Sequence, residues 1–238
     1  MRGFFFHEAT DRLMQSYLSP YFLIPVVIVV TVSLLDPFEI TCTTGLSGVQ
    51  SAFLSATFAV CLISAFAGGR FFSVFWGSAW FGSCLLLPIR RASGFWQVLL
   101  AQFLFSSSLL VMAWLAILAA LAGHPAGNLM PVILVGLASV FWTSGAAALA
   151  GLLTTPAAAS VFSGIITLYS LIPLVDPNGS IFTSAFRITT AAMPAHTGLG
   201  WPDTTAILIL AGQGLAFALA AAGLYIAGMR RMTLPGER

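Results

Sequence analysis

The sequence GRFFSVFWGSAWFGSCLLLPIRR, residues 69–91, decides the fold, because it can be counted either as a membrane span or as a connection. Its apolar run, 71–87, is separated from the preceding apolar run only by Gly69 and Arg70. Two residues are too few for the chain to reverse direction across a bilayer. We therefore predict that 71–87 prolongs the preceding helix, that the helix breaks at Pro88, and that a short surface segment follows.

The composition places the rest of the chain in a membrane. Of its 238 residues, 59% are hydrophobic and only 7% are charged, against about 25% charged residues in soluble domains. A helix needs about 20 apolar residues to cross a bilayer, so this length admits about six spans with short connections. The predicted fold class is an all-α, polytopic membrane protein.

Besides 71–87, the chain contains six apolar runs, which are separated by Gly, Pro, Arg or Asp. We predict them as the transmembrane helices of a single domain over 20–238. The predicted spans are approximately 20–35, 50–69, 95–122, 129–153, 157–175 and 204–228.

The arginines decide between six and seven spans, because Lys and Arg concentrate in short cytoplasmic loops. All nine basic residues are Arg. With six spans and the N-terminus inside, only Arg187 lies outside, and the other eight lie inside: Arg2, Arg12, Arg70, Arg90, Arg91, Arg230, Arg231 and Arg238. With seven spans, the nine arginines would divide four to five between the two sides of the membrane, which is no bias. We therefore predict six spans with both termini in the cytoplasm.

Residues 1–19 precede the first span and show a helical pattern. Phe6, Leu13 and Tyr17 share one face with Thr10. The opposite face carries charged and polar residues, namely Glu8, Asp11, Arg12 and Gln15. This amphipathic pattern predicts either a helix on the cytoplasmic membrane interface or a helical extension of the first span.

Two connections are long enough to matter for function. The segment 70–94 is rich in aromatic residues, including Trp76 and Trp80, and then becomes basic. We predict it to be cytoplasmic. The segment 176–203 is semi-polar and is predicted to lie outside, where it could dip partly into the membrane.

The residue types exclude several kinds of chemistry. A chain without Lys cannot supply a Walker A loop or a Schiff-base nitrogen. No predicted span carries an Asp, Glu, Lys, Arg or His away from its ends, whereas such groups mark proton and ion pathways in pumps. His124 and His196 lack ligand spacing, and the three cysteines form no CxxC pair. We predict no catalytic residue, cofactor site or metal site, and no binding of nucleic acid.

Small residues recur every four positions in two predicted spans. Ser144 and Ala148 lie in the fourth span, and Gly212, Ala216 and Ala220 lie in the sixth. Such stripes allow close contact between helices. We interpret them mainly as packing within the chain, with a dimer interface as the alternative.

The order of these elements resembles the membrane subunit of the type-2 family of ABC exporters. The resemblance is loose in sequence, and it covers the N-terminal helix, the six spans and the long outer segment. It is carried most directly by LLLPIRR, residues 85–91, which is similar to the family's leucine-rich, Pro-containing segment after the coupling helix. Members commonly carry a Glu and a Gly-Thr pair before these leucines, whereas this chain has WGSAWFGS at 76–83.

The resemblance implies a permease that works as a dimer, with itself or a homologous permease, in a bacterial inner membrane. A separate ABC ATPase subunit would bind ATP and Mg and would contact the segment between the second and third spans. The residues implied in coupling are Trp76, Trp80, Leu87, Pro88, Arg90 and Arg91. The alternative, suggested by the missing acidic residue, is a non-transporting subunit that scaffolds or assembles a larger membrane complex.

The predicted topology is tested by a reporter fused after Arg91. Six spans with the N-terminus inside place this position in the cytoplasm, so a GFP fusion should fluoresce and an alkaline phosphatase fusion should be inactive. A phosphatase fusion after residue 190, in the predicted outer segment, is the positive control. An active phosphatase after Arg91 would contradict the six-span arrangement.

Overall fold

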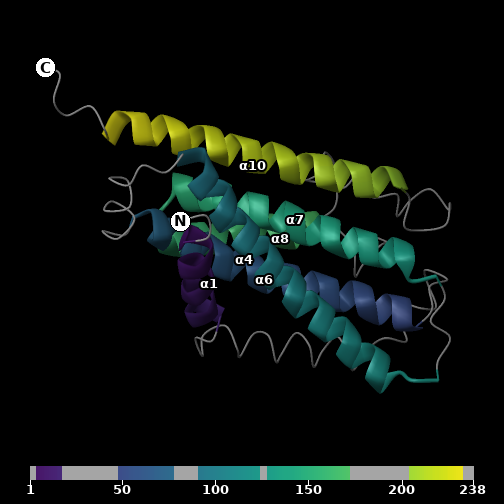
Figure 1. Cartoon of the computed structure of the whole chain (residues 1–238). Coiled ribbons are helices and arrows are strands. Elements are labelled where there is room, and N and C mark those ends of the chain that lie inside the picture. Colours follow the sequence, from purple (N-terminus) through teal and green to yellow (C-terminus); the bar gives the residue numbers. More distant parts are fainter. Residues whose placement is uncertain (1–3, 18–47, 78–90, 124–127, 172–203, 233–238) are drawn as a thin grey trace, which may run out of the picture.

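The described part of the chain is entirely helical. The computed structural model describes residues 4–17, 48–77, 91–123, 128–171 and 204–232. These residues form six helices (Figure 1): α1 (Phe4–Tyr17), α4 (Gly48–Trp76), α6 (Arg91–Ala120), α7 (Met130–Leu153), α8 (Pro156–Leu171) and α10 (Thr204–Met232). The predicted all-α fold class is confirmed for these residues.

Four of the helices are long and apolar enough to cross a membrane. The qualifying stretches are Ala52–Trp76, Ala92–Ala120, Met130–Leu153 and Leu210–Gly228, which correspond to the second, third, fourth and sixth predicted spans. The fifth predicted span, 157–175, contains α8. The described part of this span is helical from Pro156 to Leu171, and its last four residues, 172–175, lie outside the described part. The first predicted span, 20–35, lies outside the described residues.

Helix α4 confirms that the chain does not reverse at Gly69 and Arg70. The helix continues without interruption to Trp76, and the amide of Gly77 still bonds the carbonyl of Ser73 at 3.2 Å. Helix α6 begins at Arg91, four residues before the predicted boundary. The predicted connection 70–94 therefore contributes its two ends to helices, while residues 78–90 lie outside the described part.

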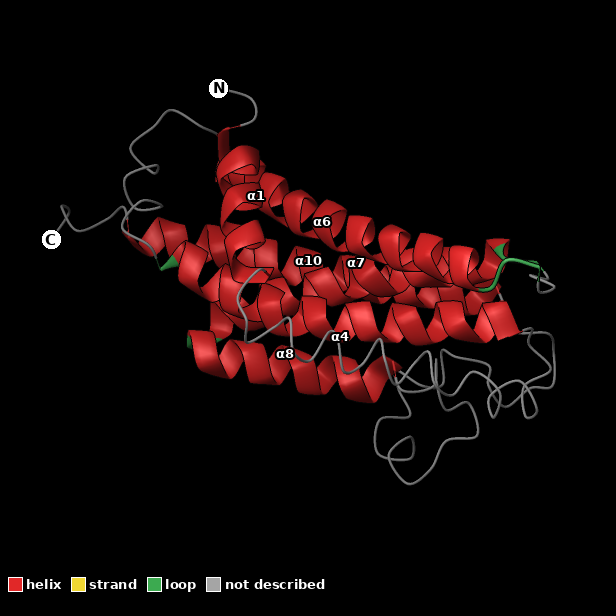
Figure 2. Ribbon diagram, turned by 90° about the horizontal axis from the view of Figure 1, so that it is seen from below, coloured by secondary structure: helices red, strands yellow, loops and turns green. Residues whose placement is uncertain are grey.

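The bundle has two hydrophobic clusters, one at each end. One cluster joins α1, the C-terminal part of α4, the N-terminal part of α6 and the C-terminal part of α10. The other joins the opposite ends of α4, α6 and α10 with the start of α7 and the end of α8. Consecutive helices α4, α6, α7 and α8 thus run in alternating directions (Figures 1 and 2), as the six-span arrangement requires of them. We refer to the first of these ends as the α1 end.

Three helices approach α4 closely at the pair Gly68 and Gly69. A Cβ atom on Gly68 would lie 2.8 Å from the Nε2 atom of Gln102 in α6 and 3.2 Å from the Cβ atom of Ala147 in α7. A Cβ atom on Gly69 would lie 2.5 Å from the carbonyl oxygen of Ala159 in α8. A larger residue at Gly69 would have to move the backbone of α8, whereas one at Gly68 would displace the Gln102 side chain and crowd Ala147. We call this pair the glycine crossing.

Serine hydroxyls hold α8 against α4. Ser160 and Ser163 donate to the backbone carbonyls of Phe66 at 2.8 Å and of Ala65 at 2.6 Å. Hydroxyl groups in membrane helices often bond backbone carbonyls in this way. These hydrogen bonds join α4 and α8, whose backbones already lie close together at Gly69.

Helices α7 and α10 make a second close contact, at Gly145 and Gly214. A Cβ atom on Gly145 would lie 2.7 Å from the Gly214 carbonyl oxygen, and one on Gly214 would lie 2.8 Å from the Trp142 Cα atom. The indole N–H of Trp142 also donates to Oε1 of Gln213 at 3.1 Å. The contact is therefore backbone against backbone, with one side-chain bond beside it.

The structure corrects one of the two predicted packing stripes. Ser144 and Ala148 of α7 are fully buried between helices. The α10 stripe Gly212, Ala216 and Ala220 is exposed, and nothing lies within 4 Å of a Cβ atom placed on Gly212. The inner face of α10 is instead offset by two residues, about 200° around the helix. The small residues on that face are Gly214, Ala218, Ala221 and Ala222.

The two faces of α10 should respond differently to the same substitution. Gly214→Leu would force α10 away from α7, and overpacking of this kind costs about 1–3 kcal/mol or more. Gly212→Leu on the exposed face is the matched control and should leave stability unchanged. The midpoint of thermal unfolding in detergent measures both, and a lower midpoint for Gly212→Leu than for Gly214→Leu would contradict the packing described.

Candidate functional site

Five aromatic side chains gather at the α1 end, where α4 ends, α6 begins and α10 ends. They are Phe72, Phe75, Trp76, Phe95 and Tyr225. The ring of Trp76 lies 4.7 Å from that of Tyr225 and 6.0 Å from that of Phe95, measured between centroids. Each such pair adds about 0.5–1.5 kcal/mol beyond the burial of its area. We call this cluster the aromatic junction.

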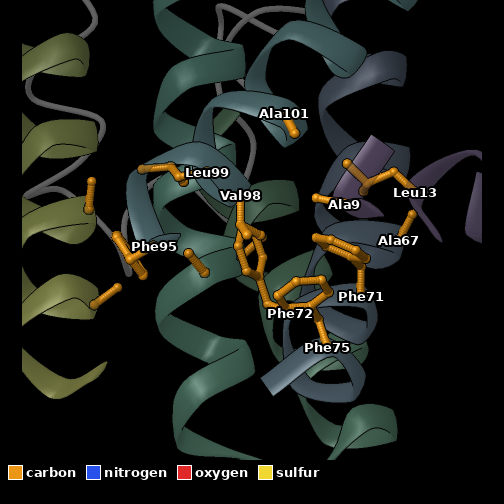
Figure 3. Packing of buried hydrophobic residues seen from close by; sticks show 14 of the residues in the cluster. Ala9, Leu13, Ala67, Phe71, Phe72, Phe75, Phe95, Val98, Leu99 and Ala101 are labelled. Carbon is orange, nitrogen blue, oxygen red and sulfur yellow. The ribbon is translucent and has the colours of Figure 1, made fainter. Parts of the chain in front are cut away.

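The aromatic junction joins α4, α6 and α10 through direct ring contacts at the α1 end. Phe95 of α6 lies 5.6 Å from Tyr225 of α10, so both contact Trp76 and each other. Figure 3 shows the α4 rings between Val98 of α6 on one side and Ala9 and Leu13 of α1 on the other. The end of α4 is therefore in direct contact with α1, α6 and α10.

Helix α1 lies across the bundle at this end (Figure 1). Its residues Ala9, Leu13 and Tyr17 are buried, and Phe6 packs partly buried against the same cluster. The guanidinium of Arg12 bonds Glu8 at 2.7 Å and lies 5.9 Å from the centre of the Phe75 ring, within the range of a cation–π contact.

The predicted amphipathic helix is thus present, with the predicted residues on one face. Asp11 and Gln15 on the opposite face are exposed, as the pattern indicates. In this structure the apolar face contacts protein, because it packs on α4 and α6. The choice between an interfacial helix and an extension of the first span depends on residues 18–35, which lie outside the described part.

A cluster of polar groups lies beneath α1, buried between α1, α4 and α6. Gln102 is fully buried and donates from Nε2 to the Tyr17 hydroxyl at 2.9 Å, to the Ser64 carbonyl oxygen at 3.3 Å and to Ser106 Oγ at 3.3 Å. The hydroxyls of Tyr17 and Ser106 are themselves 3.3 Å apart. We call these four residues the amide cluster.

Two acceptor groups of the amide cluster are not used. Among the described residues, Gln102 Oε1 and Ser64 Oγ are buried and have no hydrogen-bond partner. Burial raises the pKa of Tyr17 above 10.0, its ordinary value, although its hydrogen bonds act in the opposite direction. Tyr17 therefore stays a neutral hydroxyl, able to donate one bond and accept others.

The residues implied in coupling are only partly within the described structure. Trp76 is at the centre of the aromatic junction, and Arg91 is the first residue of α6. Trp80, Leu87, Pro88 and Arg90 lie outside the described residues. The structure thus describes Trp76 near the end of α4 and Arg91 at the start of α6, whereas residues 78–90 between them lie outside the described part.

Charged and metal-binding groups contribute little to this site. The described parts of the predicted spans carry no Asp, Glu, Lys or Arg, and Arg70, directly after the second span, is exposed near the C-terminal end of α4. No three His, Cys, Asp or Glu residues come together in the part of the chain that the structure describes. His124, His196, Cys42 and Cys84 fall outside that part, and Cys61 is buried with a free thiol. The chemistry available at this site is therefore hydrogen bonding and packing.

Sequence reasoning missed the amide cluster, because it searched the spans for ionisable groups. Gln102 is uncharged and lies inside a long apolar run. A signal was nevertheless present, since Gln102 and Ser106 are four residues apart and share one helix face. An amide in a predicted membrane span is costly to bury without hydrogen-bond partners. The position of Gln102 inside an apolar run could therefore have predicted a polar contact there.

Comparisons with known protein families, curated proteins and solved structures gave no match for this chain. The description of the site therefore rests on the sequence and the geometry. Its two parts are the aromatic junction and the amide cluster, both at the α1 end.

The aromatic junction should contribute more to stability than an exposed aromatic residue nearby. Trp76→Ala removes four ring contacts, to Phe72, Phe75, Phe95 and Tyr225, and leaves a cavity, which should cost about 2–4 kcal/mol. Trp96→Ala is the matched control, since Trp96 is 38% exposed on α6 and should cost less than about 1 kcal/mol. Thermal unfolding in detergent distinguishes them, and equal losses would argue against a junction centred on Trp76.

Proposed function

We propose that this chain is the permease subunit of an ATP-driven exporter of the type-2 ABC class, with its ATPase in a separate subunit. The observation that carries the proposal is the aromatic junction at the end of α4. Its α4 residues, among them Trp76, lie within the segment 70–94, where the family resemblance implies the contact with the ATPase.

The proposal assigns a mechanical role to the junction. A permease of this kind needs a motion at its cytoplasmic side to reach several membrane helices at once. Trp76 contacts rings of both α6 and α10, and Phe75 lies beneath Arg12 of α1. A force applied to the connection between α4 and α6 would therefore be transmitted to all four helices.

The topology belongs to the same proposal. The α1 end carries Arg12, Arg70 and Arg91 as well as the last turns of α10 with Arg230 and Arg231. By the positive-inside rule, this end faces the cytoplasm, and six spans place both termini there. The membrane would be a bacterial inner membrane.

The chain would supply the substrate pathway and not the energy. Without Lys it cannot form a Walker A loop, so ATP and Mg would bind to the partner. The uncharged inner surfaces of α4, α7 and α8 favour an apolar, amphipathic or neutral substrate over a strongly charged one. A second permease copy, or a homologous permease, would complete the pathway.

The test is purification of the tagged chain from its native membrane in mild detergent, followed by identification of its partners and assay of ATP hydrolysis. A stoichiometric ATPase subunit with a Walker A motif is expected. Replacing Arg90 and Arg91 together by Ala should reduce its recovery or its ATPase rate at least about fivefold. Arg230→Ala with Arg231→Ala, at the end of α10, is the charge-matched control.

Two other results would change the proposal in different ways. A chain that purifies with other membrane subunits but never with an ATPase would overturn the permease proposal, and would favour the scaffolding alternative. Recovery of the ATPase with transport of a strongly charged substrate would keep the permease and remove the inference about substrate class.

A further inference from the structure

The amide cluster has more bonding capacity than this conformation uses. Gln102 Nε2 makes its shortest bond, 2.9 Å, to Tyr17 of α1, and longer contacts of 3.3 Å to the Ser64 carbonyl and to Ser106 Oγ. Gln102 Oε1 and Ser64 Oγ, both buried, lack partners among the described residues. Buried polar groups are rarely left unpaired in a membrane or in a protein core. Because a hydroxyl donates and an amide oxygen accepts, these two groups would satisfy each other in an arrangement that brings them together.

The two possible partners of Gln102 belong to different helices. Tyr17 lies at the C-terminal end of α1, while Ser64 lies inside α4. Gly68, one turn after Ser64, leaves space for the amide, since a Cβ atom there would lie 2.8 Å from Nε2. Gln102 already makes a long contact to the Ser64 carbonyl oxygen, so its amide lies next to α4 and could take the Ser64 hydroxyl as a new partner when its bond to the Tyr17 hydroxyl is broken.

Helix α1 also has two possible neighbours. Its buried contacts come from a short stretch, with Ala9, Leu13 and Tyr17 as the buried positions and Phe6 half-buried. The opposite face is polar, so the released helix would be an amphipathic helix that can bury the same apolar face in the membrane interface. The same apolar face is covered in both positions, so the proposal requires their free energies to lie close enough for one buried hydrogen bond to shift the balance.

We propose that α1 is a switchable strap, whose docking on α4 and α6 is controlled by exchange of Gln102 between Tyr17 of α1 and Ser64 of α4. In the docked state Gln102 bonds Tyr17, as in this structure. In the released state Gln102 bonds the hydroxyl of Ser64, and α1 lies on the bilayer surface. A bistable element of this kind needs two discrete arrangements of comparable free energy. This inference does not depend on the proposed function, because it concerns α1, α4 and α6 alone.

The test uses the rate at which a buried position on α1 reacts with N-ethylmaleimide, a small uncharged reagent that reaches thiols in the membrane interface as well as in water. Cys42, Cys61 and Cys84 are replaced by Ala, and Ala9→Cys then supplies the single thiol in the full chain, reconstituted in liposomes. Ala9 is fully buried under docked α1, so its labelling reports release of the helix. Ala218→Cys, fully buried on the inner face of α10, reports the integrity of the bundle in each variant.

The proposal predicts opposite effects for the two partners of Gln102. Tyr17→Phe removes the docked bond and should raise the labelling rate of Ala9→Cys about five- to tenfold, the effect of one buried hydrogen bond. Ser64→Ala removes the bond of the released state and should lower the rate at least about twofold. A purely structural contribution to packing would make both variants label faster or leave both unchanged.

A double substitution provides the second measurement. In Tyr17→Phe with Gln102→Leu no buried amide is left unpaired, so the labelling rate should return to within about twofold of the parent. Gln97→Leu is the matched control on α6, because the Gln97 amide donates to Ser93 of the same helix at 3.1 Å. It should not change the rate.

Two results would overturn the proposal. One is a labelling rate of Ala9→Cys that changes in the same direction, or not at all, in Tyr17→Phe and Ser64→Ala. The other is an additive effect of Tyr17→Phe and Gln102→Leu. If Ala218→Cys labels rapidly in the Gln102→Leu chain, that variant has lost the bundle, and the two single substitutions at Tyr17 and Ser64 decide the question.

Discussion

The close approach of three helices to the glycine crossing is the constraint on which the rest of the bundle depends. Gly68 admits α6 and α7, and Gly69 admits α8. Between helices in a bilayer there is no water to exclude, so association depends on van der Waals packing and on hydrogen bonds between helices. Both become possible here only because the backbone of α4 is uncovered at two successive residues. The bonds from Ser160 and Ser163 to α4 carbonyls follow from that approach.

Much of this arrangement could be predicted from the sequence, and the reason is the cost of charge in a membrane. The arginine distribution indicated that 71–87 prolongs a helix, and α4 does run uninterrupted to Trp76. The role of Gly69 could not be obtained in the same way. In a one-dimensional pattern Gly beside Arg resembles the start of a loop, whereas in the bundle the same glycine is a contact point. Local sequence does not distinguish these uses, because both need a residue without a side chain.

The inner face of α10 shows a second limit of pattern reasoning. Small residues occur every four positions in two registers, one through Gly212 and one through Gly214. A helix that is apolar all round carries no polar face to mark its outside, so the register that packs is decided by the partner. Here the partner is Gly145 of α7, which faces the Gly214 carbonyl. Gln102 was missed for a different reason, because it is uncharged and only ionisable groups were considered within the spans.

The aromatic junction and the amide cluster are adjacent, and this connects the two proposals without making either depend on the other. Ala9, Leu13 and Tyr17 follow one another along the buried face of α1, so the helix that contacts Phe75 through Arg12 also ends at Gln102. A partner that moves the end of α4 would change the rings beneath α1 first. The hydrogen bond of Tyr17 would then lengthen or shorten with the tilt of α1 on those rings. The position of the strap would accordingly report the position of α4, whether the force comes from an ATPase or from another subunit of a complex.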